Sequence, residues 1–244
     1  CQCEFDGVDR FMALSDLHGD FVSFQEILKN TSVIDSNDNW AWGDGHLVIN
    51  GDVFDRGPEV TECLWLIYRL QQQAPLSGGA VHLTIGNHEL MVLRGDLRYV
   101  HDKYVKGITG QTGIDYDQLF GTDTELGRWL RTCPSAVRID DVLFVHAGIA
   151  PEELFQFLSI TEMNQLAWSG LDASSLQLVF DEILRGLYGS RGPFWYRGYH
   201  YDMDGYYSMA SPEDVDDVLQ FFGVDRIVVG HSEVDSLSVL YDGR

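Results

Sequence analysis

Seven consecutive residues of the chain combine side chains that suit metal and phosphate chemistry. They read Gly51-Asp52-Val53-Phe54-Asp55-Arg56-Gly57. Asp52 can bridge hard cations, Asp55 can orient a partner side chain, and Arg56 can bind a phosphate through its planar guanidinium group. The alternative is a polar surface loop that holds a single ion pair. This stretch alone does not decide between the two, so the choice depends on the rest of the chain.

Similar side chains recur at four other places along the chain. With Asp52 they form a set of six candidate ligands: Asp16, His18, Asp52, Asn87, His146 and His231. Carboxylate, imidazole and amide groups are ligands for divalent ions such as manganese, iron or zinc. Six protein ligands suit two metal ions better than one. A pair of such ions can activate water and neutralise a phosphoryl group.

Short apolar segments precede these polar residues. Residues 10–15, 46–50 and 80–85 read as buried strands, and helical patterns follow the first two loops, the earlier one capped by Asp20. Alternation of strands and helices predicts a parallel sheet with right-handed crossovers. The three loops then share one edge of the sheet, where ligands of open α/β sheets bind. Further along, residues 136–139 and 142–145 predict a hairpin, and residues 226–229 and 237–240 predict two more strands.

Composition limits the classes of partner. The chain has 244 residues, 45% of them hydrophobic, and a formal net charge of −22. Nucleic acids and anionic membranes need basic patches, so we expect neither as the main partner. No apolar segment approaches the ~18 residues of a membrane-spanning helix. The length suits one large domain or two small ones, and we expect a single domain over residues 1–244.

The four cysteines form no CxxC pair, which argues against a zinc ribbon or a thioredoxin-like site. Cys1 and Cys3 could pair with a segment outside this sequence, or Cys1 could be the lipidated residue of a processed lipoprotein. We expect an extracytoplasmic rather than a cytoplasmic protein of bacterial origin, truncated at both ends.

Five motifs occur in order along the chain. They are Asp16-x-His18-Gly19, Gly51-Asp52-x-x-Asp55-Arg56-Gly57, Gly86-Asn87-His88-Glu89, His146-x-Gly148 and Gly230-His231. Together they resemble the phosphoprotein phosphatase family of metallophosphoesterases. Residues 15–20, 95–101 and 195–199 are similar to the bacterial Shewanella-like protein phosphatases of the cold-active protein-tyrosine-phosphatase type. Ser15 departs from the glycine of most phosphoprotein phosphatases.

The resemblance implies a fold and a set of roles. The fold is α/β, a calcineurin-like β-sandwich of two sheets flanked by helices. The first metal would be held by Asp16, His18 and Asp52. The second metal would be held by Asp52, Asn87, His146 and His231. His88 would be the general acid hydrogen-bonded by Asp55, and Arg56 and Arg197 would bind the phosphate oxygens, with Asn87 also near the substrate.

The function that the resemblance implies is a phosphomonoester hydrolase that depends on two divalent metal ions. Its substrates would be phosphorylated proteins or peptides, phosphotyrosine in particular. The reaction would be in-line attack by a metal-bridging hydroxide, without a phosphoenzyme. Two alternatives stay open: a dinucleoside polyphosphate hydrolase, and a non-catalytic phosphate-binding scaffold.

Overall fold

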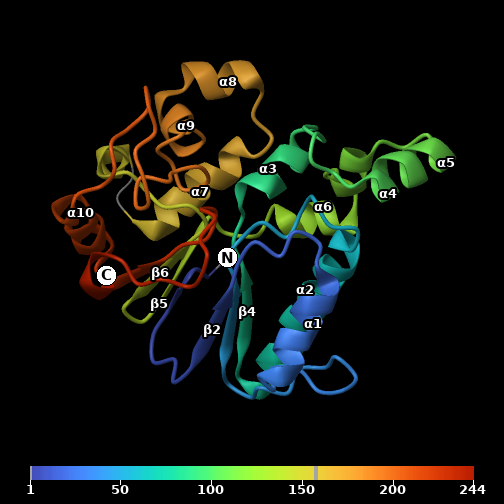
Figure 1. The fold of residues 1–244 in the computed structure, drawn as a ribbon. Helices are drawn as coiled ribbons and strands as arrows, with labels where there is room; N and C mark the ends of the chain where they lie inside the picture. The colour runs from blue at the N-terminus through green and yellow to red at the C-terminus, as the bar shows by residue number, and fades with distance from the viewer. Residues whose placement is uncertain (1, 157–158) are drawn as a thin grey trace. The chain divides into compact units, whose positions relative to one another are not determined.

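The computed structural model describes residues 2–156 and 159–244 (Figure 1). The chain divides into two compact units, each assembled from separate segments. Unit 1 comprises Cys1–Gly7, Thr84–Asn87 and Pro134–Arg244, and unit 2 comprises Val8–Leu83 and His88–Cys133. Each unit contains one β-sheet. A single domain over residues 1–244 would require that the two units fold together as one. This expectation stays a prediction.

The sheet of unit 2 has three parallel strands in the order β2-β3-β4. Their bounds are Phe11–Leu14, His46–Ile49 and Ala80–Leu83. Helix α1 (Phe21–Asn30) follows β2, and α2 (Val60–Gln73) follows β3. Asp20 caps α1, because its Oδ1 accepts a hydrogen bond of 3.0 Å from the Ser23 amide. Figure 1 shows α1 and α2 side by side along this sheet. The predicted parallel sheet is therefore confirmed.

Shorter helices complete unit 2 and support the loop after β3. They are α3 (Asn87–Leu93), whose first residue belongs to unit 1, α4 (Asp102–Tyr104), α5 (Gly110–Thr112) and α6 (Glu125–Leu130), with single turns at Ala74–Ser77, Val105–Thr109 and Tyr116–Phe120. Phe54 of the loop is fully buried, and its ring lies 4.8 Å from that of Phe120. This aromatic contact anchors the middle of the loop in the core.

Unit 1 has a four-stranded sheet in the order β1-β5-β6-β7. The strands are Glu4–Phe5, Ala136–Ile139, Val142–Val145 and Arg226–Val228. The pair β5 and β6 forms the predicted hairpin, and β7 pairs parallel to β6. The helices are α7 (Ile160–Gly170), α8 (Ser175–Phe180), α9 (Glu182–Leu187) and α10 (Pro212–Phe222), with short turns at Pro151–Gln156 and Tyr241–Gly243.

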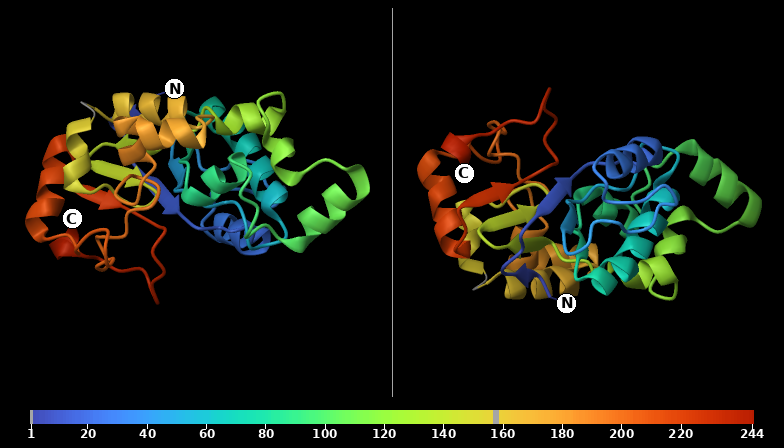
Figure 2. Two further views of the ribbon diagram at one scale, coloured as in Figure 1. Left: turned by 90° about the horizontal axis from the view of Figure 1, so that it is seen from above. Right: turned by 90° about the horizontal axis from the view of Figure 1, so that it is seen from below.

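Helix α10 closes the core of unit 1. Val215 and Val218 of the helix pack in one apolar cluster with Leu143 and Val145 of β6. Both views of Figure 2 show the helix beside this sheet. Two sheets, each accompanied by helices, confirm the predicted α/β class.

One predicted strand is wrong. Residues 237–240 form no strand, and Leu237 is 96% exposed and Val239 76% exposed. Alternating apolar residues predict a strand only where a partner strand and a buried face are present, and this segment has neither among the described residues.

The remaining composition-based expectations concern the membrane and the cysteines. Every helix among the described residues is too short or too polar to span a bilayer. Cys3, Cys63 and Cys133 are buried free thiols. Cys1 lies outside the described residues, so the expectation of its pairing or lipidation stays a prediction, as do the bacterial origin and the compartment.

Candidate active site

The loop after β2 and the loop after β3 are joined along their backbones. The His18 amide donates to the Asp52 carbonyl at 2.9 Å, and the Gly57 amide donates to the His18 carbonyl at 2.8 Å. A Cβ atom at position 57 would lie 2.3 Å from the His18 carbonyl oxygen. Only glycine permits this approach. The two loops therefore form one support for the side chains that they carry.

Backbone strain is concentrated in these two loops. Eleven non-glycine residues among those described have positive φ angles. Five of the eleven are candidate site residues of the two loops: Asp16 (54°), His18 (46°), Asp52 (55°), Asp55 (70°) and Arg56 (62°). Left-handed backbone disfavours residues with a Cβ atom, and such strain gathers where a structure must aim side chains precisely into a site.

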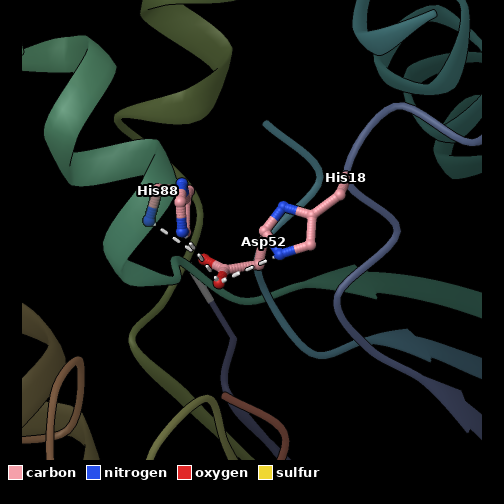
Figure 3. A group of neighbouring side chains, drawn as sticks. All are labelled: His18, Asp52 and His88. Carbon is pink, nitrogen blue, oxygen red and sulfur yellow. Dashed lines mark hydrogen bonds and ion pairs between the residues drawn. The ribbon is translucent and has the colours of Figure 1, made fainter. Parts of the chain in front are cut away.

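Three side chains of unit 2 converge on one point (Figure 3). Asp52 Oδ2 lies 3.9 Å from His18 Nε2 and 4.0 Å from His88 Nε2. One ligand atom from each of these three residues lies within 4.8 Å of the other two. The Asp52 side chain is only 2% exposed. A buried carboxylate between two imidazole nitrogens has the composition of a divalent metal site.

The state of His18 fits such a site. Its Nδ1 lies 2.8 Å from the Phe54 carbonyl oxygen, which can only accept, so Nδ1 carries the proton. Nε2 then presents its lone pair on the side of Asp52. Burial is the largest influence on His18, and it lowers the pKa of the imidazole below its usual value. A neutral imidazole with its other nitrogen fixed by a carbonyl is the usual form of a metal ligand.

Asp16, predicted to share this metal, lies in the same pair of loops but outside the group of three. Its amide donates to the Gly51 carbonyl at 3.2 Å. The Ser15 hydroxyl lies 2.6 Å from Asp16 Oδ2 and 2.9 Å from the Asn50 carbonyl oxygen. The serine that departs from the common glycine therefore contacts the carboxylate of a candidate ligand directly.

His88 has a close acidic partner. Its Nδ1 lies 2.6 Å from Asp55 Oδ2, and both side chains are buried. Burial alone would lower the pKa of His88, but the hydrogen bond with Asp55 and the charges of Asp52 and Glu89 outweigh it and raise the pKa. The imidazole is thus held by one carboxylate and favoured in its protonated form.

Glu89, the last residue of the motif Gly86-Asn87-His88-Glu89, supports the loop of residues 51–57. The side chain is fully buried, and its carboxylate accepts hydrogen bonds from the amides of Asp52 (2.8 Å), Val53 (2.7 Å) and Phe54 (3.2 Å). Three amide donors to one carboxylate fix the loop against α3. The motif and the position at the start of a helix indicate a supporting residue, but not the three amides that it contacts.

Arg56 and Tyr99 are exposed at the same site. The Arg56 amide donates to the Tyr99 carbonyl at 2.9 Å. Within the described part of the chain, the Arg56 guanidinium makes no hydrogen bond or ion pair, which leaves its fork available to an anion. The Tyr99 side chain is 50% exposed, and its ring centroid lies 5.5 Å from that of His88.

Unit 1 brings together four other candidate residues. Asn87 Oδ1 lies 3.1 Å from His146 Nε2, and His146 is fully buried. The rings of His146 and His231 lie 5.1 Å apart. Arg197 donates from Nη1 to the His231 carbonyl at 2.6 Å. His231, like the residues of the two loops in unit 2, has a positive φ, of 63°.

Residues 9–235 match the family model of the calcineurin-like phosphoesterases. The chain belongs to this family. This phosphoesterase is 28% identical over 229 residues to Shewanella-like protein phosphatase 1 of Plasmodium berghei, covering 93% of the chain and 62% of that protein. It is 30% identical over 233 residues to an uncharacterised protein of Schizosaccharomyces pombe, covering 90% of the chain and 66% of that protein. The chain thus spans less than two thirds of either relative.

The crystal structure of the cold-active protein-tyrosine phosphatase of a psychrophilic Shewanella species is similar to this phosphoesterase. The two have a TM-score of 0.92 and 42% sequence identity over 98% of this chain and 70% of that chain. The fold and the resemblance to Shewanella-like phosphatases are therefore confirmed. Calcineurin-like phosphoesterases normally bind divalent metal ions. Within the group of His18, Asp52 and His88, the first two have the form of metal ligands, whereas the protonated form that is favoured in His88 does not bind a metal ion.

Proposed function

We propose that this phosphoesterase is a metal-dependent phosphomonoesterase that hydrolyses phosphorylated proteins, with a preference for phosphotyrosine. The observation that carries the proposal is the arrangement around His88. Asp55 holds one of its nitrogens at 2.6 Å, Asp52 lies 4.0 Å from the other, and the same loop carries the available guanidinium of Arg56. A protonated imidazole and an anion-binding fork beside a candidate metal site suit phosphate ester hydrolysis.

The proposed ligand sets follow the family resemblance. Asp16, His18 and Asp52 would hold one ion, and Asp52, Asn87, His146 and His231 would hold another, so that Asp52 belongs to both sets. When bound, two divalent ions activate water and neutralise charge on the phosphoryl group. They also compensate locally for the net charge of −22, which otherwise opposes the binding of a phosphate.

Each remaining site residue has a separate task in this proposal. Arg56 and Arg197 bind the phosphate oxygens. Arg197 donates from Nη1 to the His231 carbonyl, and its Nη2 lies 3.5 Å from His231 Nδ1. The remaining N–H groups of the guanidinium are available for oxygen atoms. His88 donates a proton to the leaving oxygen. Asp55 orients His88 and keeps it protonated.

Tyr99 supports a preference for aryl phosphates. Its half-exposed ring lies beside His88, the residue proposed to protonate the leaving group. A leaving group that reaches His88 therefore meets an aromatic face. Offset or edge contacts between aromatic rings contribute about 0.5–1.5 kcal/mol beyond burial, which an alkyl leaving group cannot obtain.

Tyr99→Ala is expected to raise the KM for a phosphotyrosine peptide about two- to twelvefold, because it removes this aromatic contact. The KM for the matched phosphoserine peptide should change by less than about twofold. Steady-state kinetics on the two peptides measure the effect, and Tyr99→Phe, which keeps the ring, serves as the control. Equal losses on both peptides would contradict a role in selecting aryl leaving groups.

The function itself is tested by metal analysis coupled to a substrate panel. The panel contains p-nitrophenyl phosphate, matched phosphotyrosine, phosphoserine and phosphothreonine peptides, and diadenosine tetraphosphate. We expect bound divalent metal and the highest kcat/KM on the phosphotyrosine peptide. Faster turnover of diadenosine tetraphosphate would favour a dinucleoside polyphosphate hydrolase. Protein that binds no metal and is inactive on p-nitrophenyl phosphate with manganese would favour a phosphate-binding scaffold.

A further inference from the structure

Unit 1 contains a cavity of about 560 Å³ that the proposed chemistry does not use. Its walls come from Pro151 and Glu152, from Arg191 and Tyr196, and from the loop of residues 202–210 together with Asp214 of α10. A turn at Gly205, closed by backbone hydrogen bonds between Met203 and Tyr207, shapes this loop. The volume suits a side chain or a small molecule.

The charge of the walls selects a cation. Four carboxylates line the cavity against one arginine: Glu152, Asp202, Asp204 and Asp214, with Arg191. The Arg191 guanidinium donates to the Tyr206 carbonyl. Two of the carboxylates, Glu152 and Asp204, are exposed and make no hydrogen bond or ion pair with any described residue. The cavity therefore has a net negative wall with two carboxylates ready for a partner.

The walls also contain aromatic groups, and one of these has an unused polar atom. Tyr196 is only 2% exposed, and its ring packs against those of Tyr199 (5.2 Å) and Tyr207 (4.8 Å). Its hydroxyl makes no hydrogen bond with the described residues, although the hydroxyl of a mostly buried tyrosine usually has a partner. Since Tyr196 lines the cavity, a bound ligand can supply that partner.

The cavity adjoins a residue proposed to bind phosphate. Tyr196 immediately precedes Arg197 in the chain, and the Tyr207 hydroxyl accepts a hydrogen bond of 3.1 Å from the Arg197 amide. A peptide whose phosphate binds at Arg197 can thus reach the cavity with a side chain only a few residues away, since an extended chain advances about 3.3–3.6 Å per residue.

We propose that this cavity binds a lysine or arginine side chain of the substrate, close in sequence to the phosphorylated residue. The carboxylates of Glu152 and Asp204 pair with the cation, and the rings of Tyr206 and Tyr207, which also line the cavity, lie beside it. The proposal rests on the proposed phosphatase function and deepens it, because it names the sequence around the phosphorylation site that this enzyme prefers. The chain's net charge of −22 also favours the approach of a basic peptide.

The test scans one arginine along an otherwise neutral phosphotyrosine peptide. At the best position, arginine is expected to lower the KM about tenfold relative to alanine. The double variant Glu152→Gln/Asp204→Asn should lose most of this gain. Its kcat/KM on the all-neutral peptide and on p-nitrophenyl phosphate should stay unchanged, because neither residue belongs to the proposed catalytic site. Tyr196→Phe, which deletes only the hydroxyl, should reduce the KM advantage of the arginine peptide by a factor of about three.

A second double variant separates the cavity from general electrostatics. Asp217→Asn/Asp225→Asn removes the same charge from exposed positions of unit 1 that do not line the cavity. It should keep the arginine preference. A preference lost equally in both double variants, or no preference at any scanned position of the wild-type protein, would overturn the cavity as the binding site.

Failure of this proposal can be told apart from failure of the phosphatase function. A protein that hydrolyses neutral phosphopeptides without any arginine preference refutes only the cavity. If the protein hydrolyses no phosphopeptide, titration calorimetry with the unphosphorylated arginine peptide still tests the cavity. Binding that is weakened in Glu152→Gln/Asp204→Asn and unchanged in the control supports it, and no binding refutes it.

Discussion

Asp52→Asn is expected to remove bound metal and to lower kcat/KM at least about a thousandfold, since metal ions supply several kcal/mol of transition-state stabilisation. The carboxylate is 2% exposed and faces two imidazole nitrogens through Oδ2. Its Oδ1 accepts a hydrogen bond of 2.9 Å from the His88 amide. An asparagine can keep that bond through its carbonyl oxygen, so the substitution removes the charge with little change in shape.

Metal content per protein, measured after desalting, and rates on p-nitrophenyl phosphate test this expectation together. Asp20→Asn is the matched control. Asp20 lies in the loop after β2 and caps α1, and asparagine caps helices as well as aspartate does. The control should keep both metal and activity. An Asp52→Asn protein with wild-type metal content would contradict the assignment of Asp52 as the shared ligand.

His88→Asn is expected to lower the rate of hydrolysis by a factor that depends on the leaving group. Loss of a general acid lowers rates by about 10²–10⁴-fold when the leaving oxygen needs a proton. An alkyl phosphate should show the full loss. A phenolic leaving group, with a pKa near 10, needs less help, so aryl phosphates should lose less and p-nitrophenyl phosphate least. Equal losses across the series would exclude His88 as the acid.

Asp55→Asn provides the companion test. Asp55 contacts His88 at 2.6 Å and lies outside both proposed sets of metal ligands. Its replacement should reproduce the dependence on the leaving group while metal content stays at the wild-type level. Metal loss in Asp55→Asn would show that acid catalysis and metal binding are not divided between the two aspartates of this loop.

Much of unit 2 could be predicted because its signals are local. Each strand of the parallel sheet is a short apolar segment that ends in polar residues, and parallel pairing alone brings those ends to one edge. The hairpin of β5 and β6 could also be predicted from the sequence, since its two apolar segments are joined directly by Asp140 and Asp141. In these places hydrophobic periodicity and chain topology determine the structure without reference to distant residues.

Other features depend on tertiary contacts that spacing does not encode. Glu89 reads as an ordinary first-turn acid, and its role appears only when three amides of another loop meet it. The position of the Tyr99 ring beside His88 depends on how a segment with little periodicity folds back to His88. The segment of residues 237–240 failed as a strand because intrinsic preference cannot supply a partner.

The left-handed residues of the two loops have a consequence for engineering this enzyme. Left-handed backbone costs about 1–2 kcal/mol at a residue with a Cβ atom. Substitution by glycine removes this cost from the folded state. It also raises the conformational entropy of the unfolded chain, which cancels only part of the gain in stability. Arg56 is exposed, and its guanidinium makes no hydrogen bond or ion pair with a described residue, so glycine there should gain up to about 1 kcal/mol of stability. Libraries sorted for thermal stability alone should therefore enrich Arg56→Gly and discard a proposed phosphate ligand. Sorting for stability and turnover together is what would keep the arginine.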